Sequence, residues 1–369
     1  MELNMNTEFQ VKKSDLAQHR TVQSDIAPLQ DGEVRLKIDQ FAFTANNLTY
    51  GATGDTLGYW QFFPPADNDD GSWGILPVWA FADVVESNCA DLPVGDRLYG
   101  YFPPATLLTM KPQHVSAHNL IDGAAHRQAL PPLYNRYSRV LAEPNYNPAT
   151  DAARILLAPL HVTSFCLYDL LRDQQWYGAE QVVIVSASSK TSLGLAHGLS
   201  NDSASPPVIG LTSPANVPFV SSLSLYDQIT AYPAVAADVG ERATVVVDMA
   251  GNASVRAALQ DRLGDKLKHY VSVGLTHWED MGDELAFSQT GPTSNHEMFF
   301  APSYILKRLK DWGPAEFDRQ STAFVAAAAT ATFEWMSVDD RQGLPALSEV
   351  YPLVCAGSIS PAAGLVIKM

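Results

Sequence analysis

The stretch Gln181–Gly194, QVVIVSASSKTSLG, decides the fold of this chain. Its first five residues form a short continuous apolar run, which is typical of a strand buried on both faces of a parallel sheet. Hydroxyl side chains and Lys190 follow the run, and Thr191–Leu199 has helical spacing. A buried strand that turns directly into a helix is the repeating unit of a doubly wound α/β sheet. We therefore expect such a sheet to begin at Gln181.

The same alternation continues on both sides of this stretch. Further buried strands are expected at 207–211, 229–232, 243–248 and 267–273. Helices are expected at 152–172, 217–223, 253–263, 302–312 and 321–336, and the tail 350–369 is expected to return to strands. We predict that residues 146–339 form a Rossmann-type dinucleotide-binding domain.

The first 140 residues are rich in strand patterns instead. Glu33–Phe43 alternates polar and apolar residues, and similar runs lie at 78–86 and 97–102. Residues 1–145 are therefore expected to form a second, β-rich domain. The predicted class is α/β, with a β-rich domain beside a doubly wound parallel sheet.

Charge and composition exclude several classes of function. Lys and Arg number 24 against 40 Asp and Glu, which gives a net charge of −16 among 369 residues. Non-specific nucleic-acid binding needs a positive surface, and no stretch provides one. The N-terminus lacks the apolar core of a signal peptide, and the most apolar window, 155–171, contains a proline and an aspartate. The three cysteines are far apart, so we expect no disulfides. Together these features predict a cytoplasmic protein without a membrane span.

The turn after the first buried strand is the candidate phosphate site. A helix N-terminus favours an anion through its unpaired N–H groups and its dipole. Ser188, Ser189, Lys190 and Thr191 occupy the place of the usual glycines, of which only Gly194 remains. Hydroxyls donate to phosphate oxygens, and a lysine supplies a point charge. The alternative interpretation is an ordinary helix cap followed by an exposed lysine.

The end of the second strand bears on which dinucleotide would bind. Thr212, Ser213 and Asn216 follow that strand, and no carboxylate appears before Asp227. An acidic residue here holds the ribose of NAD but would repel the 2′-phosphate of NADP. Neutral polar groups therefore favour NADP, although they also suit an ordinary turn. Because no arginine lies nearby, Lys190 or Tyr232 would have to help hold the phosphate.

Two later strand ends complete the expected cofactor site. Ala250 lies in the turn 248–252, and Gly274 and Thr276 follow the strand 267–273. Gly274 would allow the backbone to approach the nicotinamide. His277 either contacts substrate or serves as a structural hydrogen-bonding group.

Several of these segments resemble the medium-chain dehydrogenase/reductase superfamily. The resemblance covers most of the chain and rests on the segments 44–47, 95–97 (GDR), 182–194 and 219–232. It implies that residues 1–145 form the GroES-like domain, which the C-terminal residues 340–369 complete. It also implies that Tyr232 contacts the 2′-phosphate of NADP, and that the chain forms a homodimer through a sheet edge.

A narrower resemblance rests on longer strings. SASSKTSLGL, GLTSPANVPFV, VDMAGN, VGLTHWED and FFAPSYILKR resemble an uncharacterised bacterial family within that superfamily, known as a domain of unknown function. That resemblance implies no established reaction.

A catalytic zinc is not expected. The zinc enzymes of the superfamily use Cys and His ligands, whereas Asn46 stands near the first ligand position and no Cys-rich lobe is present. His114, His118 and His126 are close in sequence, but the turn residues around them argue against a shared helical face.

Without a metal, hydride transfer needs hydrogen-bond donors for the oxyanion that develops on the substrate. Tyr50, Asn46 and His161 are the predicted catalytic residues, although packing roles are the alternative for Tyr50 and His161. The aromatic run 59–63 either walls an apolar substrate pocket or packs in the core. The leading hypothesis is a zinc-independent, NADPH-preferring oxidoreductase of enones, quinones or carbonyl compounds. An NADP(H)-binding protein without redox activity and a structural oligomer are the alternatives.

Overall fold

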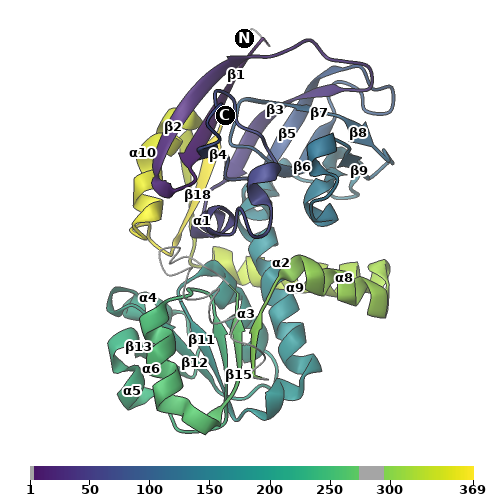
Figure 1. Ribbon diagram of the computed structural model, residues 1–369. Helices are drawn as coiled ribbons and strands as arrows, with labels where there is room; N and C mark the ends of the chain where they lie inside the picture. The colour runs from purple at the N-terminus through teal and green to yellow at the C-terminus, as the bar shows by residue number, and fades with distance from the viewer. Residues whose placement is uncertain (1–3, 274–294) are drawn as a thin grey trace. The chain divides into compact units, whose positions relative to one another are not determined.

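The chain has two compact units in a computed structural model that describes residues 4–273 and 295–369. Unit 1 comprises Met1–Leu156 and Ser337–Met369, and unit 2 comprises Leu157–Met336. Unit 1 contains mainly strands, whereas unit 2 contains a parallel sheet with helices (Figure 1).

Unit 2 contains a six-stranded parallel sheet in the order β13-β12-β11-β14-β15-β16. The strands are β11 (Gln181–Val185), β12 (Val208–Thr212), β13 (Gln228–Ala231), β14 (Thr244–Asp248), β15 (Leu267–Ser272) and β16 (His296–Met298). The chain builds outward from β11 first through β12 and β13, then on the other side through β14. The strand order therefore reverses beside β11, which is where doubly wound sheets bind ligands.

Alternate side chains of β11 enter separate cores on the two faces of this sheet. Val182 and Ile184 pack with residues of α2 (Asp151–Asp173), α3 (Lys190–Ser200) and α9 (Pro314–Phe333). Val183 and Val185 pack with residues of α5 (Val235–Asp238) and α6 (Ala253–Leu263). Burial on both faces explains the unbroken apolar run, and the predicted doubly wound sheet is confirmed.

Unit 1 contains two sheets, one of three strands in the order β2-β1-β4 and one of nine strands. The longer path runs β17-β18-β3-β5-β6-β10-β9-β8, with β7 paired to β3. Their bounds are β1 (Met5–Lys12), β2 (Asp15–Asp25), β3 (Val34–Ala42), β4 (Trp73–Gly74), β5 (Val78–Ser87), β6 (Arg97–Phe102), β7 (Leu107–Met110), β8 (Pro112–Gln113), β9 (Asn119–Asp122), β10 (Arg136–Arg139), β17 (Ser337–Gln342) and β18 (Ala363–Lys368). The C-terminal strand β18 pairs antiparallel with β3, so the end of the chain joins this sheet.

The tail of the chain differs from the prediction. Strands were expected throughout 350–369, but α10 (Gly343–Cys355) extends into that segment, and only β18 is a strand there. The buried residues of α10 include Leu344, Leu347, Val350 and Val354, which recur at helical spacing. The prediction was wrong because the apolar residues near 350 continue a helical pattern that begins upstream at Leu344.

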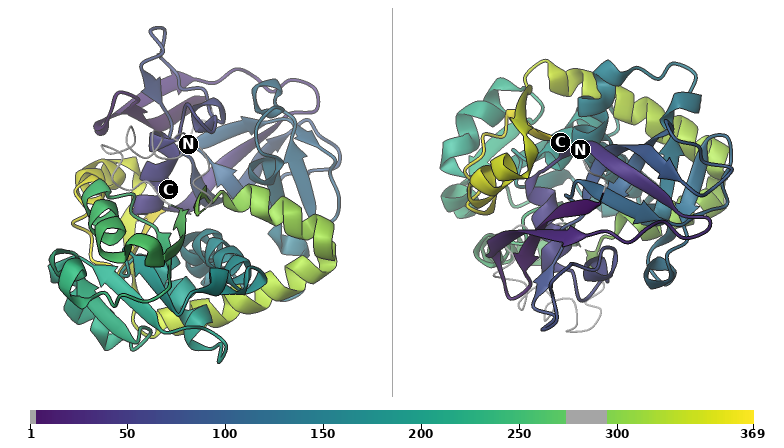
Figure 2. Two further views of the ribbon diagram at one scale, coloured as in Figure 1. Left: turned by 60° about the horizontal axis from the view of Figure 1, so that its bottom comes forward. Right: turned by 90° about the horizontal axis from the view of Figure 1, so that it is seen from above.

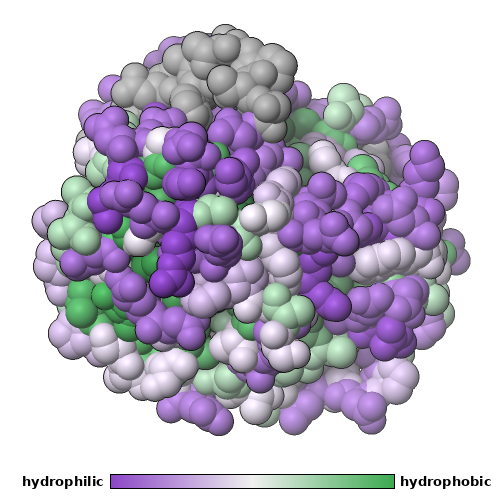
Figure 3. All heavy atoms as spheres, turned by 90° about the horizontal axis from the view of Figure 1, so that it is seen from below, coloured by the Kyte–Doolittle hydropathy of each residue, from purple (hydrophilic) through white to green (hydrophobic). Residues whose placement is uncertain are grey.

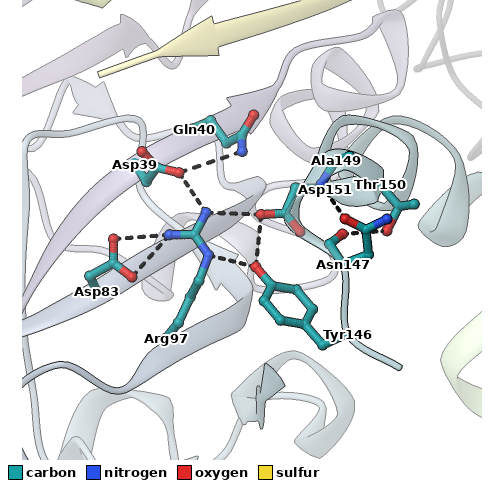
Figure 4. Close-up of polar contacts among 9 residues, drawn as sticks. All are labelled: Asp39, Gln40, Asp83, Arg97, Tyr146, Asn147, Ala149, Thr150 and Asp151. Atoms are coloured by element: carbon teal, nitrogen blue, oxygen red, sulfur yellow. Dashed lines mark hydrogen bonds and ion pairs between the residues drawn. The ribbon is translucent and has the colours of Figure 1, made fainter. Parts of the chain in front are cut away.

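The Gly95-Asp96-Arg97 turn has a structural role in unit 1. The guanidinium of Arg97 binds three carboxylates, with N···O distances of 2.6 Å to Asp39, 2.9 Å to Asp83 and 2.9 Å to Asp151 (Figure 4). Arg97 also donates to the hydroxyl of Tyr146. Because Asp151 begins α2, this one side chain ties the first turn of that helix to β3, β5 and β6.

The helix α2 is a core helix. Within the described ranges, 148–173 is the single helical stretch long and apolar enough to cross a membrane by composition, and 61% of its most apolar window is buried inside the fold. Two further helices, α8 (Ala301–Trp312) and α9, meet at Gly313, which has a φ of +83° (Figure 2). On the face drawn in Figure 3, hydrophilic side chains predominate and hydrophobic ones form small separate groups.

Candidate functional site

The turn between β11 and α3 has the geometry of an anion site. Ser186 has a φ of +65°, a left-handed conformation that favours glycine, so a serine here takes the backbone role of the first missing glycine. Ser189 caps α3, since its hydroxyl accepts the N–H of Ser192 at 3.2 Å. The turn is therefore built without glycine.

Two backbone donors of this turn are left available for a ligand. Among the residues that the structure describes, no acceptor pairs with the N–H groups of Ser188 and Thr191. Thr191 lies in the first turn of the 11-residue helix α3, where N–H groups have no intrahelical partner and the dipole is positive. These amides fit a phosphate group at the carboxyl end of β11.

The hydroxyl of Ser188 joins this turn to the end of β12. It accepts from the side-chain amide of Asn216 at 3.1 Å and from the hydroxyl of Thr212 at 3.4 Å. With these two donors on its oxygen, the Ser188 proton is free to point to another acceptor. Ser213 begins the short turn that carries Asn216, whose N–H donates to the Ser213 carbonyl. The structure thus brings together four of the predicted cofactor residues.

Asp227 is held at the opposite end of β12. Its backbone N–H donates to the carbonyl of Val208, and its carboxylate accepts the Val208 N–H at 2.7 Å. Val208 is the first residue of β12, whereas the ligand edge of a parallel sheet lies at the last residues. Asp227 therefore does not supply the acidic group that holds the ribose of NAD.

Lys190 and Tyr232 belong to the same region of unit 2. Lys190 begins α3 and is half-buried, and burial lowers its pKa to about 8. Tyr232 directly follows β13. Burial raises the pKa of Tyr232 to about 12, the nearby Asp248 carboxylate adds to that rise, and hydrogen bonding with Ser186 opposes it. Tyr232 thus lies close to the turn after β11.

Asp248 organises the turn after β14, a role that the sequence reasoning missed. One carboxylate oxygen accepts the N–H groups of Ala250 at 2.8 Å and Gly251 at 3.1 Å. The other accepts the hydroxyl of Tyr270 at 2.6 Å, across to β15. Burial raises the pKa of Asp248, and these hydrogen bonds oppose the rise. The predicted residue Ala250 is buried and placed by this carboxylate.

The predicted cofactor site also includes residues that follow β15. Gly274, Thr276 and His277 lie outside the described residues. At the described end of β15, the hydroxyl of Ser272 and Nε2 of His296 are 2.9 Å apart. This pair was also missed, because its members are distant in sequence and meet only through the pairing of β15 with β16.

Gly194 serves helix packing. A Cβ atom at this position would lie 2.6 Å from Oγ of Ser164 and 2.8 Å from Cδ2 of His161, so the glycine lets α3 approach α2. His161 is fully buried there, and neither ring nitrogen has a hydrogen-bond partner within the described ranges. Burial lowers its pKa to about 4. The imidazole is therefore neutral at physiological pH.

The other two predicted catalytic residues lie in unit 1. Asn46 and Tyr50 are four residues apart on α1 (Ala45–Ala52), and thus on one helix face. Tyr50 is buried, and the indole N–H of Trp79 donates to its hydroxyl at 3.4 Å. Burial raises the pKa of Tyr50, while hydrogen bonds with Trp79 and Asn46 oppose the rise.

The aromatic run after α1 packs in the core of unit 1. Its four aromatic residues are all buried, and they are Tyr59, Trp60, Phe62 and Phe63. The hydroxyl of Tyr59 lies 2.9 Å from that of Tyr134. The contacts of these rings are therefore mainly with the protein itself.

A metal-binding cluster is not formed by the described part of the chain, where no group of three or more His, Cys, Asp and Glu side chains could hold an ion. Of the three histidines considered from the sequence, His126 lies 3.2 Å from the carbonyl oxygen of Phe62.

Several solved structures have a similar fold. CurA from Vibrio vulnificus, in a complex with NADPH, is 12% identical, with a TM-score of 0.62 over 98% of this chain and 99% of that one. A putative NADPH:quinone reductase from Bacillus thuringiensis is 13% identical, with a TM-score of 0.55 and 99% of both chains covered. The quinone oxidoreductase from Coxiella burnetii is 13% identical, with a TM-score of 0.54 and the same coverage.

At these identities the comparison shows the fold alone. It is the fold of the medium-chain dehydrogenase/reductase superfamily, a GroES-like unit with a Rossmann unit, as the resemblance implied. No curated protein matches the sequence. One family does match, over residues 41–360, and it is described as "Protein of unknown function (DUF2855)". Since this match covers most of the chain, the protein belongs to the DUF2855 family.

Proposed function

We propose that this protein is a zinc-independent oxidoreductase that uses NADPH to reduce an enone, a quinone or a carbonyl compound. The observation that carries the proposal is the pair of unpaired N–H groups, Ser188 and Thr191, at the N-terminus of α3 beside Lys190. CurA, which shares the fold, is bound to NADPH.

In this proposal the edge of the unit 2 sheet binds the dinucleotide. The amides of Ser188 and Thr191, with Ser189 and Lys190, hold the diphosphate. Thr212, Ser213, Asn216 and Tyr232 surround the ribose 2′-phosphate. Ala250 lies beside the cofactor, and Gly274 and Thr276 complete the list of proposed contacts. The position of Asp227 at the other end of β12 supports binding of NADP rather than NAD.

NADPH supplies a hydride when it is bound, and the protein must then stabilise negative charge on the substrate oxygen. Tyr50 and Asn46 are the proposed donors to that oxygen. Because burial raises the pKa of Tyr50, its hydroxyl keeps its proton at neutral pH and is available as a donor. His161 was grouped with them from the sequence, but its complete burial against Gly194 supports a packing role instead.

An NADP(H)-binding protein without redox activity is the second candidate. The burial of Tyr50 favours it, because a donor covered by protein cannot reach a substrate without local movement. We also propose a cytoplasmic location and a small-molecule substrate, without nucleic-acid or membrane partners. Pairing of two copies through a sheet edge is the proposed oligomer.

Two measurements test the proposal. Fluorescence titration should show NADPH binding that is at least tenfold tighter than NADH binding. Consumption of NADPH should then be followed at 340 nm with a panel of enones, quinones and aldehydes. Binding without consumption supports the second candidate, and absence of binding contradicts both. The Lys190→Ala variant is the matched control for site-specific binding.

A further inference from the structure

Two aromatic side chains of the unit 1 sheet meet at the hydroxyl of Tyr50. Trp79 on β5 and Tyr101 on β6 are direct cross-strand partners, so their side chains project from the same face. Their ring centroids are 5.4 Å apart. The ring of Tyr50 lies 5.4 Å from that of Tyr101 at an interplanar angle of 86°. The three rings therefore form one contact group.

Trp79 determines how the Tyr50 hydroxyl is used. An indole N–H is a donor only, so at 3.4 Å the Tyr50 oxygen must be the acceptor. A phenol that accepts through its oxygen still has its own proton to donate. The contact thus leaves the Tyr50 O–H to point toward a different group.

Tyr101 carries a buried hydroxyl that lacks a partner. The residue is fully buried, and its hydroxyl forms no hydrogen bond with any part of the chain that the structure describes. The hydroxyls of Tyr59 and Tyr134 lie 2.9 Å from each other, and neither forms a hydrogen bond with Tyr101 in the described structure. A buried hydroxyl without a partner is rare and costly, and it calls for a group that it serves. The Tyr50 oxygen is the candidate partner, because the rings of Tyr50 and Tyr101 are in edge contact at 5.4 Å, and Tyr101 also opposes the burial-raised pKa of Tyr50.

We propose that Trp79 and Tyr101 are positioning residues that direct the Tyr50 O–H toward the substrate oxygen: Trp79 donates to the Tyr50 oxygen, and the unpaired Tyr101 hydroxyl closes on the same oxygen when substrate is bound. This inference rests on the proposed function and names two further residues of its site. Two donors on one hydroxyl oxygen polarise its O–H bond and strengthen the hydrogen bond that it donates. The gain is largest when the substrate oxygen becomes negative, so it appears in kcat more than in KM.

Removal of single oxygen atoms gives the sharpest kinetic test. Tyr101→Phe should lower kcat about threefold to tenfold with little change in KM, which corresponds to the loss of one hydrogen bond. Tyr351→Phe is the matched control, because Tyr351 is also a buried tyrosine of unit 1, and its hydroxyl donates to the carbonyl of Leu16. Tyr351→Phe should match wild type. Equal kinetics in Tyr101→Phe and Tyr351→Phe would overturn the proposal.

A double-mutant cycle separates positioning from general stability. If Tyr101 acts through Tyr50, Tyr101→Phe should cost nothing more once Tyr50→Phe is present. Additive losses in the double variant would contradict the inference, because Tyr101 would then act independently of Tyr50.

A spectroscopic test needs no turnover and remains informative if no substrate is consumed. With ¹⁵N-labelled tryptophan, the indole N–H resonance of Trp79, assigned with Trp79→Phe, should shift in Tyr50→Phe and remain unshifted in Tyr351→Phe. An unshifted resonance in Tyr50→Phe would refute the contact itself. A shifted resonance in a protein that consumes no NADPH would instead confirm the contact and refute the proposed function.

Discussion

The cofactor edge of unit 2 and the phenol group of unit 1 present hydrogen-bond donors in opposite ways. At the end of β11 the donors are backbone amides and short hydroxyls on a half-buried turn. Around Tyr50 they are buried phenols and the half-buried indole of Trp79. The first kind follows from local geometry, because a helix N-terminus presents unpaired amides whatever its side chains are. The second kind requires strands and a helix to be packed together first.

The largest effect is expected from removing the hydroxyl of Tyr50 in unit 1. Tyr50→Phe should lower kcat by roughly 100-fold or more, the usual cost of removing an oxyanion donor. The dissociation constant of NADPH should be unchanged, because that site belongs to unit 2. Steady-state kinetics and fluorescence titration measure the two quantities. A variant with wild-type kcat would remove Tyr50 from the proposed mechanism.

The next largest effect is expected from removing the charge of Lys190 in unit 2. Lys190→Ala should weaken NADPH binding roughly tenfold to 100-fold, as expected for a lost hydrogen bond between charged groups. The value of kcat at saturating NADPH should change little. Lys310→Ala, which removes an exposed lysine of α8, is the control for net charge. Unchanged NADPH affinity in Lys190→Ala would show that the phosphate assignment is wrong.

The lowered pKa of Lys190 adds a pH dependence of a few-fold. Its ammonium is charged below about pH 8 and is lost above it, so NADPH affinity should fall as the pH rises from 7 to 9. Lys190→Arg keeps its charge across this range, and its affinity should stay level. Titrations at several pH values provide the measurement. An equal fall in both proteins would assign the titration to another group.

The smallest effect concerns His161, a buried side chain of unit 2 whose ring nitrogens have no hydrogen-bond partner within the described residues. Its pKa is near 6.5 when unfolded and about 4 when folded, so protonation of the unfolded chain destabilises the native state as the pH falls from 6.5 to 4. His161→Leu should remove this part of the acid sensitivity and change Tm at pH 7 by only a few degrees. Thermal unfolding across that pH range tests it. A large loss of kcat in His161→Leu would instead restore its catalytic assignment.

Local sequence patterns predicted most of the parallel sheet. β11 and α6 have the expected bounds, β14 and β15 differ from expectation by one residue at one end, and β12 and β13 are shifted by one residue at both ends. A strand buried on both faces must be apolar throughout, so its pattern does not depend on which elements cover it. The candidate hydroxyls of the phosphate turn could be found for the same reason, since a turn after such a strand lies at the ligand edge.

Contacts between distant residues could not be predicted in this way. Asp248 meets Tyr270, and Ser272 meets His296, only because their strands are neighbours. The packing of Gly194 against α2 was equally hidden, although the glycine itself was noticed. Nothing in the local sequence marks the partner in such a pair.

Three features could be predicted from the sequence alone. They are the alternation of strands and helices, the polar turn after β11, and the lack of an acidic residue at the end of β12. These features depend on neighbouring residues and on backbone geometry. Tertiary structure alone decided that Gly194 serves helix contact, that His161 is sealed between helices, and that the Tyr50 hydroxyl accepts from Trp79. Those outcomes depend on burial, which changes the pKa and the available partners of a side chain only after distant segments have packed around it.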